Sequence, residues 1–337
     1  MEFATLTMSI FDPFYSAFGW IMRVLYDLVN NYGLVIILFT ILIRGIFLLP
    51  LNIRSQRSMM KQQAVAPLIN DIKRRFGDDK QRVQEETMKV YKEHGVKLTA
   101  GCLPMILQLI IIIPIWRSIQ APLRYIMNVS AENLQKVADL LSGEGLLTAN
   151  QAKGILANNI PLLDALGKSA QSVAEVVNKG WLKMTDLLDM SFLGLNLGAT
   201  PSISPAKLFG EEMGIYLPLM LIPLLALVTT FLQTKVTEWT SPAQKRLKEQ
   251  KALAKKNPAR QTPENDPSAA MTSSMKYFMP LMIVFFTFSM PAAMGLYWVV
   301  GNILGIAQSY AIYWILYGFP KKKTKPQIVP VNQATGS

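Results

Sequence analysis

Charged residues are scarce in this chain of 337 amino acids. They make up 17% of the sequence, against roughly 25% in an ordinary soluble domain, while hydrophobic residues make up 51%. Several apolar windows approach the 20 or so residues that cross a hydrocarbon core. The composition therefore predicts an all-α membrane protein, with five transmembrane helices at 32–51, 101–120, 214–232, 276–290 and 293–316.

Residues that carry catalysis or bind metal are also scarce. The chain has one cysteine, Cys102, and one histidine, His94, which excludes an internal disulfide and a cysteine-based metal cluster. His94 lies in a charged loop without an HExxH motif, and no serine in a span has a plausible partner base. We therefore expect no enzyme activity, no metal site and no cofactor.

A secondary transporter is a second class that the sequence disfavours. Such proteins place carboxylates or histidines within their spans to couple ions to transport. The five apolar windows contain no Asp, Glu or His, and no inverted repeat is visible.

Lys and Arg are unevenly distributed among the connections. Eleven lie in 52–100, nine in 233–276 and four in 317–337, whereas 1–31 has one; 121–213 has seven against nine acidic residues, a net charge of 7 − 9 = −2. Because basic connections stay in the cytoplasm, we expect the N-terminus outside and the C-terminus inside. The net charge of +12 is then mainly a topology signal. DNA is not an expected partner, since the basic segments lack interleaved aromatics; ribosomal RNA stays open.

Two segments are expected outside the membrane. Residues 1–31 lack a basic n-region and a small-residue cleavage site, and are predicted to form an amphipathic helix lying in the outer interface. Residues 121–213 show helical periodicity with glycine breaks, which predicts a helical insertion packed over the outer face or lying on the membrane. The apolar stripe of the first segment comprises Phe14, Phe18, Ile21, Leu25 and Leu28.

The first cytoplasmic segment, 52–100, is predicted to be a charged helical hairpin. Gly77 breaks it, Asp78 or Asp79 can cap the second arm, and Gly95 can end that arm. A loop this long exceeds what is needed to join two spans. We therefore expect a surface that binds partners.

Two further cytoplasmic segments have simpler compositions. Residues 233–275 are rich in Lys, Gln, Ala and Pro, which is typical of a flexible loop. Residues 317–337 form a basic tail suited to anionic lipid headgroups, and a ribosome contact is the alternative.

One permanent charge, Arg44, interrupts the first apolar window. A charge at the centre of a bilayer costs about 2.5–3.5 kcal/mol on insertion scales, so the side chain must face protein or water. Thr40 shares its helix face, and Gln108 is expected at the same depth. The alternative is a purely structural charge bonded to its neighbours.

Polar and aromatic side chains also recur at the inner end of the third window and along one face of the fifth. For Gln108 and Asn302 the alternative is a simple interhelical hydrogen bond, worth about 0.6 kcal/mol. The candidates in these two windows are Gln233, Trp298 and Asn302.

Four stretches of the chain resemble, in order, the YidC family of membrane protein insertases. They are FTILIRGIFLLPL, FGDDKQRVQEETMKVYKEHGV, GCLPMILQL and MPLMIVFFTFSMPAAMGLYWVVGNILGIAQSY. The resemblance implies a bacterial plasma-membrane protein of the five-span form, without the large domain that precedes the core in Gram-negative members. Residues 121–213 and the second cytoplasmic loop are longer than the family pattern.

The resemblance also implies a mechanism. Five helices would surround a hydrophilic groove open to the cytoplasm and to lipid, through which an insertase and chaperone moves short polar tails of nascent membrane proteins before releasing their transmembrane segments sideways. Arg44 matches the family's groove arginine, and Thr40, Gln233 and Trp298 match other groove positions. The implied partners are nascent membrane proteins, membrane lipids, and a ribosome, targeting factor or secretion channel at the hairpin and basic tail.

Overall fold

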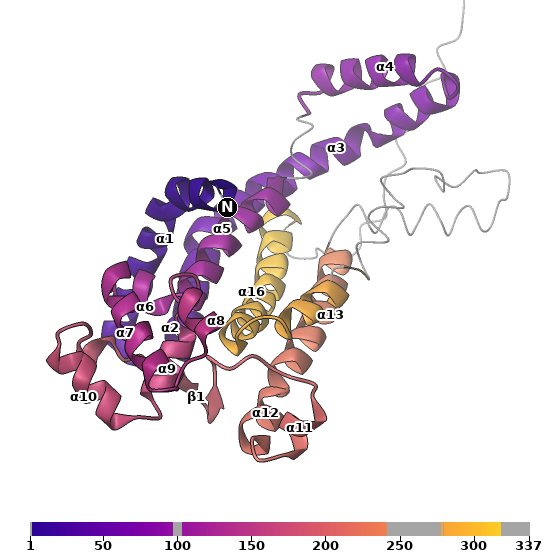
Figure 1. The fold of residues 1–337 in the computed structure, drawn as a ribbon. Coiled ribbons are helices and arrows are strands. Elements are labelled where there is room, and N and C mark those ends of the chain that lie inside the picture. Colours follow the sequence, from indigo (N-terminus) through magenta and orange to yellow (C-terminus); the bar gives the residue numbers. More distant parts are fainter. Residues whose placement is uncertain (1, 97–102, 241–277, 279, 318–337) are drawn as a thin grey trace, which may run out of the picture.

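The computed structural model describes residues 2–96, 103–240, 278 and 280–317, and side chains from residue 12 onward except at 59, 62, 63 and 103–109. It is mostly helical (Figure 1), which confirms an all-α membrane protein with one small β-hairpin added. The helices of the bundle and its hairpin arm are α1 (Glu2–Val29), α2 (Tyr32–Leu42), the π-helix η1 (Ile43–Leu48), α3 (Leu49–Arg75), α4 (Lys80–Glu93), α5 (Leu103–Gln120), α13 (Leu221–Thr240) and α16 (Ala292–Tyr317).

Three helices in the described part of the chain are long and apolar enough to cross a membrane. They are Tyr32–Ser58, Met213–Thr240 and Ala292–Leu316. Within α5, Ile110–Gln120 is a shorter apolar helix. Of the fourth predicted span, residues 280–287 are helical and its beginning lies outside the described residues. The second and fourth spans therefore remain predictions.

The helices extend past two of the predicted boundaries. From Tyr32 to Arg75, α2, η1 and α3 follow one another without a break, so the first helix of the predicted hairpin continues the first span. Residues 233–240, predicted to be flexible loop, form the last turns of α13. The rest of that loop and residues 318–337 of the tail lie outside the described residues.

Helix α1 packs along α2, α5 and α6, and Phe18, Ile21 and Leu25 of the predicted stripe lie against the main core. The structure buries Tyr15, Met22 and Tyr26, whereas Phe14 and Leu28 are exposed. Gly19 lies on the buried face, where a Cβ atom would collide with the carbonyl group of Tyr125. The absence of a side chain there lets α1 approach α6 closely.

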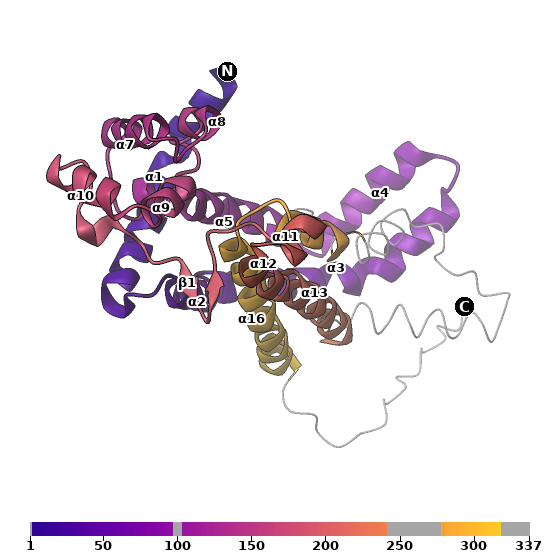
Figure 2. The same ribbon diagram turned by 60° about the horizontal axis from the view of Figure 1, so that its bottom comes forward.

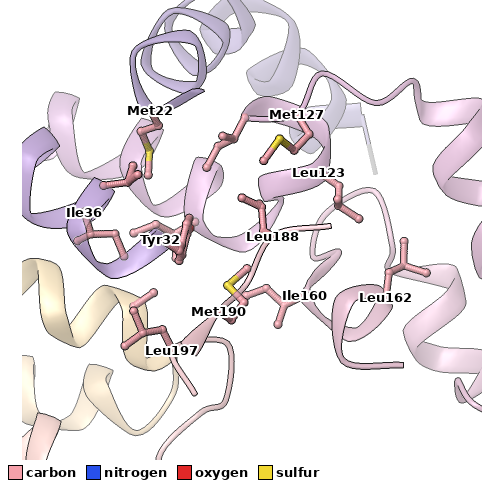
Figure 3. Close-up of a cluster of buried hydrophobic side chains, with 14 of the residues drawn as sticks. Met22, Tyr32, Ile36, Leu123, Met127, Ile160, Leu162, Leu188, Met190 and Leu197 are labelled. Atoms are coloured by element: carbon pink, nitrogen blue, oxygen red, sulfur yellow. The ribbon is translucent and has the colours of Figure 1, made fainter. Parts of the chain in front are cut away.

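The segment between α5 and α13 folds as a compact cap on the bundle. Its apolar side chains join those of α1 and α2 in a single core (Figure 3), so the cap and the bundle are packed together. Its elements are α6 (Pro122–Tyr125), α7 (Ala131–Gly143), α8 (Ala149–Lys153), α9 (Ile160–Leu166), α10 (Ala170–Asn178), η3 (Met184–Asp186), β1 (Ser191–Phe192), β2 (Leu195–Asn196), α11 (Pro205–Phe209) and α12 (Met213–Leu219).

Hydrogen bonds also fasten this cap to the bundle. The backbone N–H groups of Ala292 and Ala293, at the start of α16, donate to the carbonyl oxygens of Ala199 (2.9 Å) and Leu197 (2.9 Å). These N–H groups lack partners within their own helix. The cap therefore satisfies donors that the fifth predicted span would otherwise leave unpaired.

An arm of two antiparallel helices, α3 and α4, projects away from the bundle (Figure 1). Asp79 caps α4 by accepting a hydrogen bond from the N–H of Arg82 (3.0 Å), and Gly95 adopts a positive φ of 61°. Both features agree with the sequence prediction. The arm has its own small core, made of Val65, Ile69 and Val96.

Candidate functional site

The first span changes its helical geometry at Arg44. In η1 the N–H of Leu49 donates to the carbonyl of Arg44, five residues back, which is the π-helical pattern. The next residue, Pro50, has no N–H to donate, and its ring would clash with the carbonyl of residue 46 in a regular α-helix. Pro50 therefore accounts for the wider turn, and π-turns of this kind frequently occur at functional sites.

The guanidinium of Arg44 lies against the backbone of α16. A Cβ atom built on Gly301 would be 2.9 Å from Nη2 and 3.2 Å from Nε, and one built on Gly305 would be 3.2 Å from Nη1. A side chain at either position would occupy the space that the guanidinium fills. We call Gly301 and Gly305 the glycine notch. The notch makes room for the guanidinium of Arg44 between the first and fifth predicted spans.

Two polar side chains share this position with Arg44. The phenol of Tyr297 interacts with the guanidinium, and the amide of Gln233, from α13, occupies the space where a Cβ of Gly305 would be. Arg44 itself is partly exposed, although its Nε atom is buried and has no hydrogen-bond partner in the described part of the chain. Nor does any carboxylate among the described residues lie within ion-pair distance of it.

Asn302 contributes a second polar contact between α13 and α16. Its Nδ2 group donates to the hydroxyl oxygens of Thr229 (3.0 Å) and Thr230 (2.8 Å). These hydroxyls in turn donate to the backbone carbonyls of Leu225 and Ala226. All three side chains are buried, so this geometry holds the two helices together next to Arg44.

The remaining predicted residues lie deeper in protein or outside the described part. Thr40 is completely buried and its hydroxyl donates to the carbonyl of Ile36 (2.6 Å). Trp298 is 9% exposed and its ring lies 6.4 Å from that of Phe286. The backbone of Gln108 belongs to α5, but its side chain lies outside the described residues.

Sequence reasoning missed the glycine notch and Tyr297. The signal for the notch is the GxxxG spacing in GNILG, which lets two helices approach closely in a membrane. The signal for the π-turn is Pro50, six residues after the charge. Neither signal identifies Arg44 as the side chain that fills the notch.

Apolar helices of spanning length that enclose a cation and interhelical amide contacts define a multi-pass α-helical membrane protein with a polar site inside its bundle. The model of the 60Kd inner membrane protein family matches residues 24–317. The chain belongs to this family, which confirms the resemblance found in its motifs.

Relatives described as membrane protein insertase YidC match the chain along most of its length. One from Prosthecochloris aestuarii is 26% identical over 309 residues, covering 88% of this chain and 38% of the relative. One from Leptospira interrogans serovar Lai is 24% identical over 322 residues, covering 95% and 37%. A shorter match, to Caldanaerobacter subterraneus subsp. tengcongensis, is 41% identical over 98 residues, or 29% and 47%. The chain thus spans less than half the length of the Prosthecochloris and Leptospira relatives.

Proposed function

We propose that this chain is a membrane protein insertase and chaperone. It would receive the short polar tail of a nascent membrane protein from the cytoplasm in a hydrophilic groove around Arg44, and then release the transmembrane segment into lipid. The observation that carries the proposal is a permanent cation in a spanning helix, seated on the glycine notch with no carboxylate partner among the described residues. Family membership supports it.

The proposed chemistry is electrostatic and needs no covalent step. An acidic tail meets a low-dielectric barrier, and a fixed guanidinium part of the way across offers a charge-assisted hydrogen bond to its carboxylates. Arginine suits this role because it stays protonated and its planar fork can pair with a carboxylate through two hydrogen bonds. The amide of Gln233 would add a neutral donor and acceptor beside it.

Partitioning of the apolar segment into lipid would drive the release step. Each Leu, Ile, Phe or Val at the centre of a span contributes roughly −0.3 to −0.6 kcal/mol on the insertion scale. The outward face of α13 is apolar along its length, with Leu224, Val228 and Phe231 exposed. A substrate helix leaving the site along α13 and α16 would therefore exchange one apolar contact for another.

The other predicted site residues take supporting roles in this proposal. Asn302 would hold α13 and α16 at the spacing the groove requires, and Trp298 would close its apolar wall. Thr40 would fix the turn that precedes Arg44, and Gln108 would line the groove from α5.

Topology and partners are part of the same proposal. The basic α3–α4 arm and the basic tail would lie in the cytoplasm, where a ribosome, targeting factor or secretion channel delivers substrates. The cap, of net charge −2 over 121–213, would lie outside with the N-terminus. Five spans are consistent with this arrangement.

Reconstitution into proteoliposomes tests the proposed function. The vesicles should protect a newly synthesised single-span substrate from added protease, whereas protein-free vesicles should not. Uptake of small solutes is measured in the same vesicles. Solute uptake without protection of the substrate would show that the chain is a transporter and not an insertase.

A further inference from the structure

The tip of the β-hairpin carries an apolar side chain in an unfavourable conformation. β1 and β2 pair with Ser191 opposite Asn196 and Phe192 opposite Leu195, which leaves Leu193 and Gly194 as a two-residue turn. Both turn residues have positive φ, 50° and 78°. Leucine rarely adopts this region, and such turns prefer Asn-Gly or Asp-Gly.

This leucine is also the most exposed large apolar side chain in the described part of the chain, at 85%. The hairpin itself is firmly held, because Phe192 packs where a Cβ of Gly33 would lie and β2 contacts α12. Figure 2 shows the hairpin between α2 and α12. A firmly held hairpin whose tip exposes a strained leucine indicates an apolar environment at that tip.

A shallow apolar pocket adjoins the tip and continues onto the spanning helix. It has a volume of about 480 Å³ and is lined by Leu193, Leu195, Leu217, Pro218, Met220, Leu221 and Leu224. Leu221 and Leu224 are 49% and 56% exposed and belong to the apolar face of α13 that a bilayer must cover. The tip therefore extends a lipid-facing surface.

A lysine and a tyrosine indicate where the membrane interface lies. The ammonium of Lys207 donates to the hydroxyl of Tyr216 (3.0 Å) and lies 4.4 Å from the centre of its ring. This hydrogen bond raises the pKa of Lys207. Lysine and tyrosine are typical of the headgroup level. Leu224 lies 224 − 216 = 8 residues beyond Tyr216, about 12 Å further along the helix.

We propose that the hairpin tip inserts among the acyl chains of the outer leaflet, with Leu193 and the adjoining pocket in direct contact with lipid. Lipid chains are the occupant because the pocket continues the exposed face of a spanning helix and begins on the apolar side of the Lys207–Tyr216 pair. The insertion anchors the outer cap beside α12 and α13 and fixes its depth.

Site-specific fluorescence tests the proposal in the full-length protein. Cys102 is replaced by alanine, Leu193→Cys is labelled with an environment-sensitive dye, and the protein is placed in liposomes with or without doxyl-labelled lipids. Gln171→Cys, at an exposed polar position on α10, is the matched control. The probe at 193 should be quenched several-fold more by the lipid quencher and several-fold less by aqueous iodide than the control.

Equal iodide quenching at the two positions would overturn the proposal. So would lipid quenching that appears only after a substrate protein is added, because the tip would then contact substrates and not the resting bilayer. If the labelled Leu193→Cys variant melts below the control, Ser191→Cys, at an exposed position on the same hairpin, takes its place and must be quenched more by the lipid quencher than Gln171→Cys.

Discussion

The two ends of the bundle carry helical segments that differ in how they are held. The cap adds completely buried side chains such as Leu134, Leu141 and Leu162 to the main core. Among its described residues, the α3–α4 arm buries the apolar side chains of Val65, Ile69 and Val96 in a small core of its own, and α4 has no buried residue. The cap is therefore a structural part of the bundle, whereas the arm is an accessible projection.

Because of this difference, we expect the cap to govern the stability of the bundle and the arm to govern the delivery of substrates. Losing cap contacts removes core packing and the partners of the N–H groups that begin α16. The arm can open locally at little cost to the bundle, because local opening costs little where few apolar contacts are buried. Substitutions at the two ends should consequently have different signatures.

Removing the cap should have the largest effect. Deletion of residues 131–189 eliminates α7 to α10 and most of the cap's contribution to the core. We expect loss of folded protein, measured as membrane abundance and as the absence of a cooperative melting transition. A deletion variant that accumulates and melts like the intact chain would show that the cap is separable.

Matched truncations of single side chains sharpen the comparison. Leu141→Ala, in the cap core, should lower stability by about 2–5 kcal/mol, since a buried leucine leaves a cavity. Ile69→Ala, in the arm, should leave the main melting transition nearly unchanged and loosen only the arm. Hydrogen exchange resolves the two regions; equal losses of bundle protection would contradict the distinction.

Shortening the arm should reduce function without reducing stability. Removing about two helical turns from α3 and two from α4 next to Gly77, roughly seven residues from each helix, keeps the chain reversal at Gly77 but removes the projecting surface. Insertion of substrates in the presence of ribosomes should fall, while the melting temperature stays constant. A proportional loss of insertion and of melting temperature would show that the arm is a structural part of the bundle.

Substitution in the glycine notch should have the smallest effect on stability, and it should reduce insertion of only some substrates. In Gly301→Ala the new methyl group would displace the flexible end of Arg44, and alanine favours a helix by about 0.5–1 kcal/mol over glycine. The melting temperature should therefore hold or rise while insertion of acidic-tailed substrates falls. Gly45→Ala, with no atom within 4 Å of its Cβ, is the control.

A double-mutant cycle tests whether the notch acts through Arg44. Residues in direct contact typically show interaction energies of about 0.5–3 kcal/mol. In an Arg44→Lys background the displaced Nη2 atom is absent, so Gly301→Ala should have little further effect on insertion. Strictly additive losses would mean that Gly301 serves only helix packing.

The sequence predicts the class of protein well because spanning helices and basic connections leave strong compositional signals. It predicts Arg44 as a candidate because a charge in an apolar window is conspicuous. The predicted stripe of α1 is divided between two environments, since Phe18, Ile21 and Leu25 pack against the main core whereas Phe14 and Leu28 are exposed. Lipid and protein interior are both apolar, so hydrophobic spacing does not distinguish the two environments in a membrane protein.

The cap and the site could be predicted only in part for a related reason. Helical periodicity over 121–213 indicates helices but not that their apolar faces merge with the bundle core. The GxxxG spacing at Gly301 and Gly305 indicates close approach, yet the wider turn before Pro50 changes the helical geometry that aims Arg44. Side-chain direction after a π-turn requires the three-dimensional structure.

The central claim is that Arg44 acts as an uncompensated cation for acidic substrate tails. Its most direct test compares insertion of two substrates that differ only in tail charge, acidic or neutral, by the intact chain, Arg44→Ala and Arg44→Lys. Arg57→Ala, on the exposed surface of α3, is the matched charge-removal control, and protein abundance and melting temperature are followed throughout. Arg44→Ala should reduce insertion of the acidic substrate about tenfold, the scale of a charge-assisted hydrogen bond, and that of the neutral substrate far less, while Arg44→Lys keeps much of the activity. A folded Arg44→Ala protein that inserts both substrates less well by the same factor would contradict the claim.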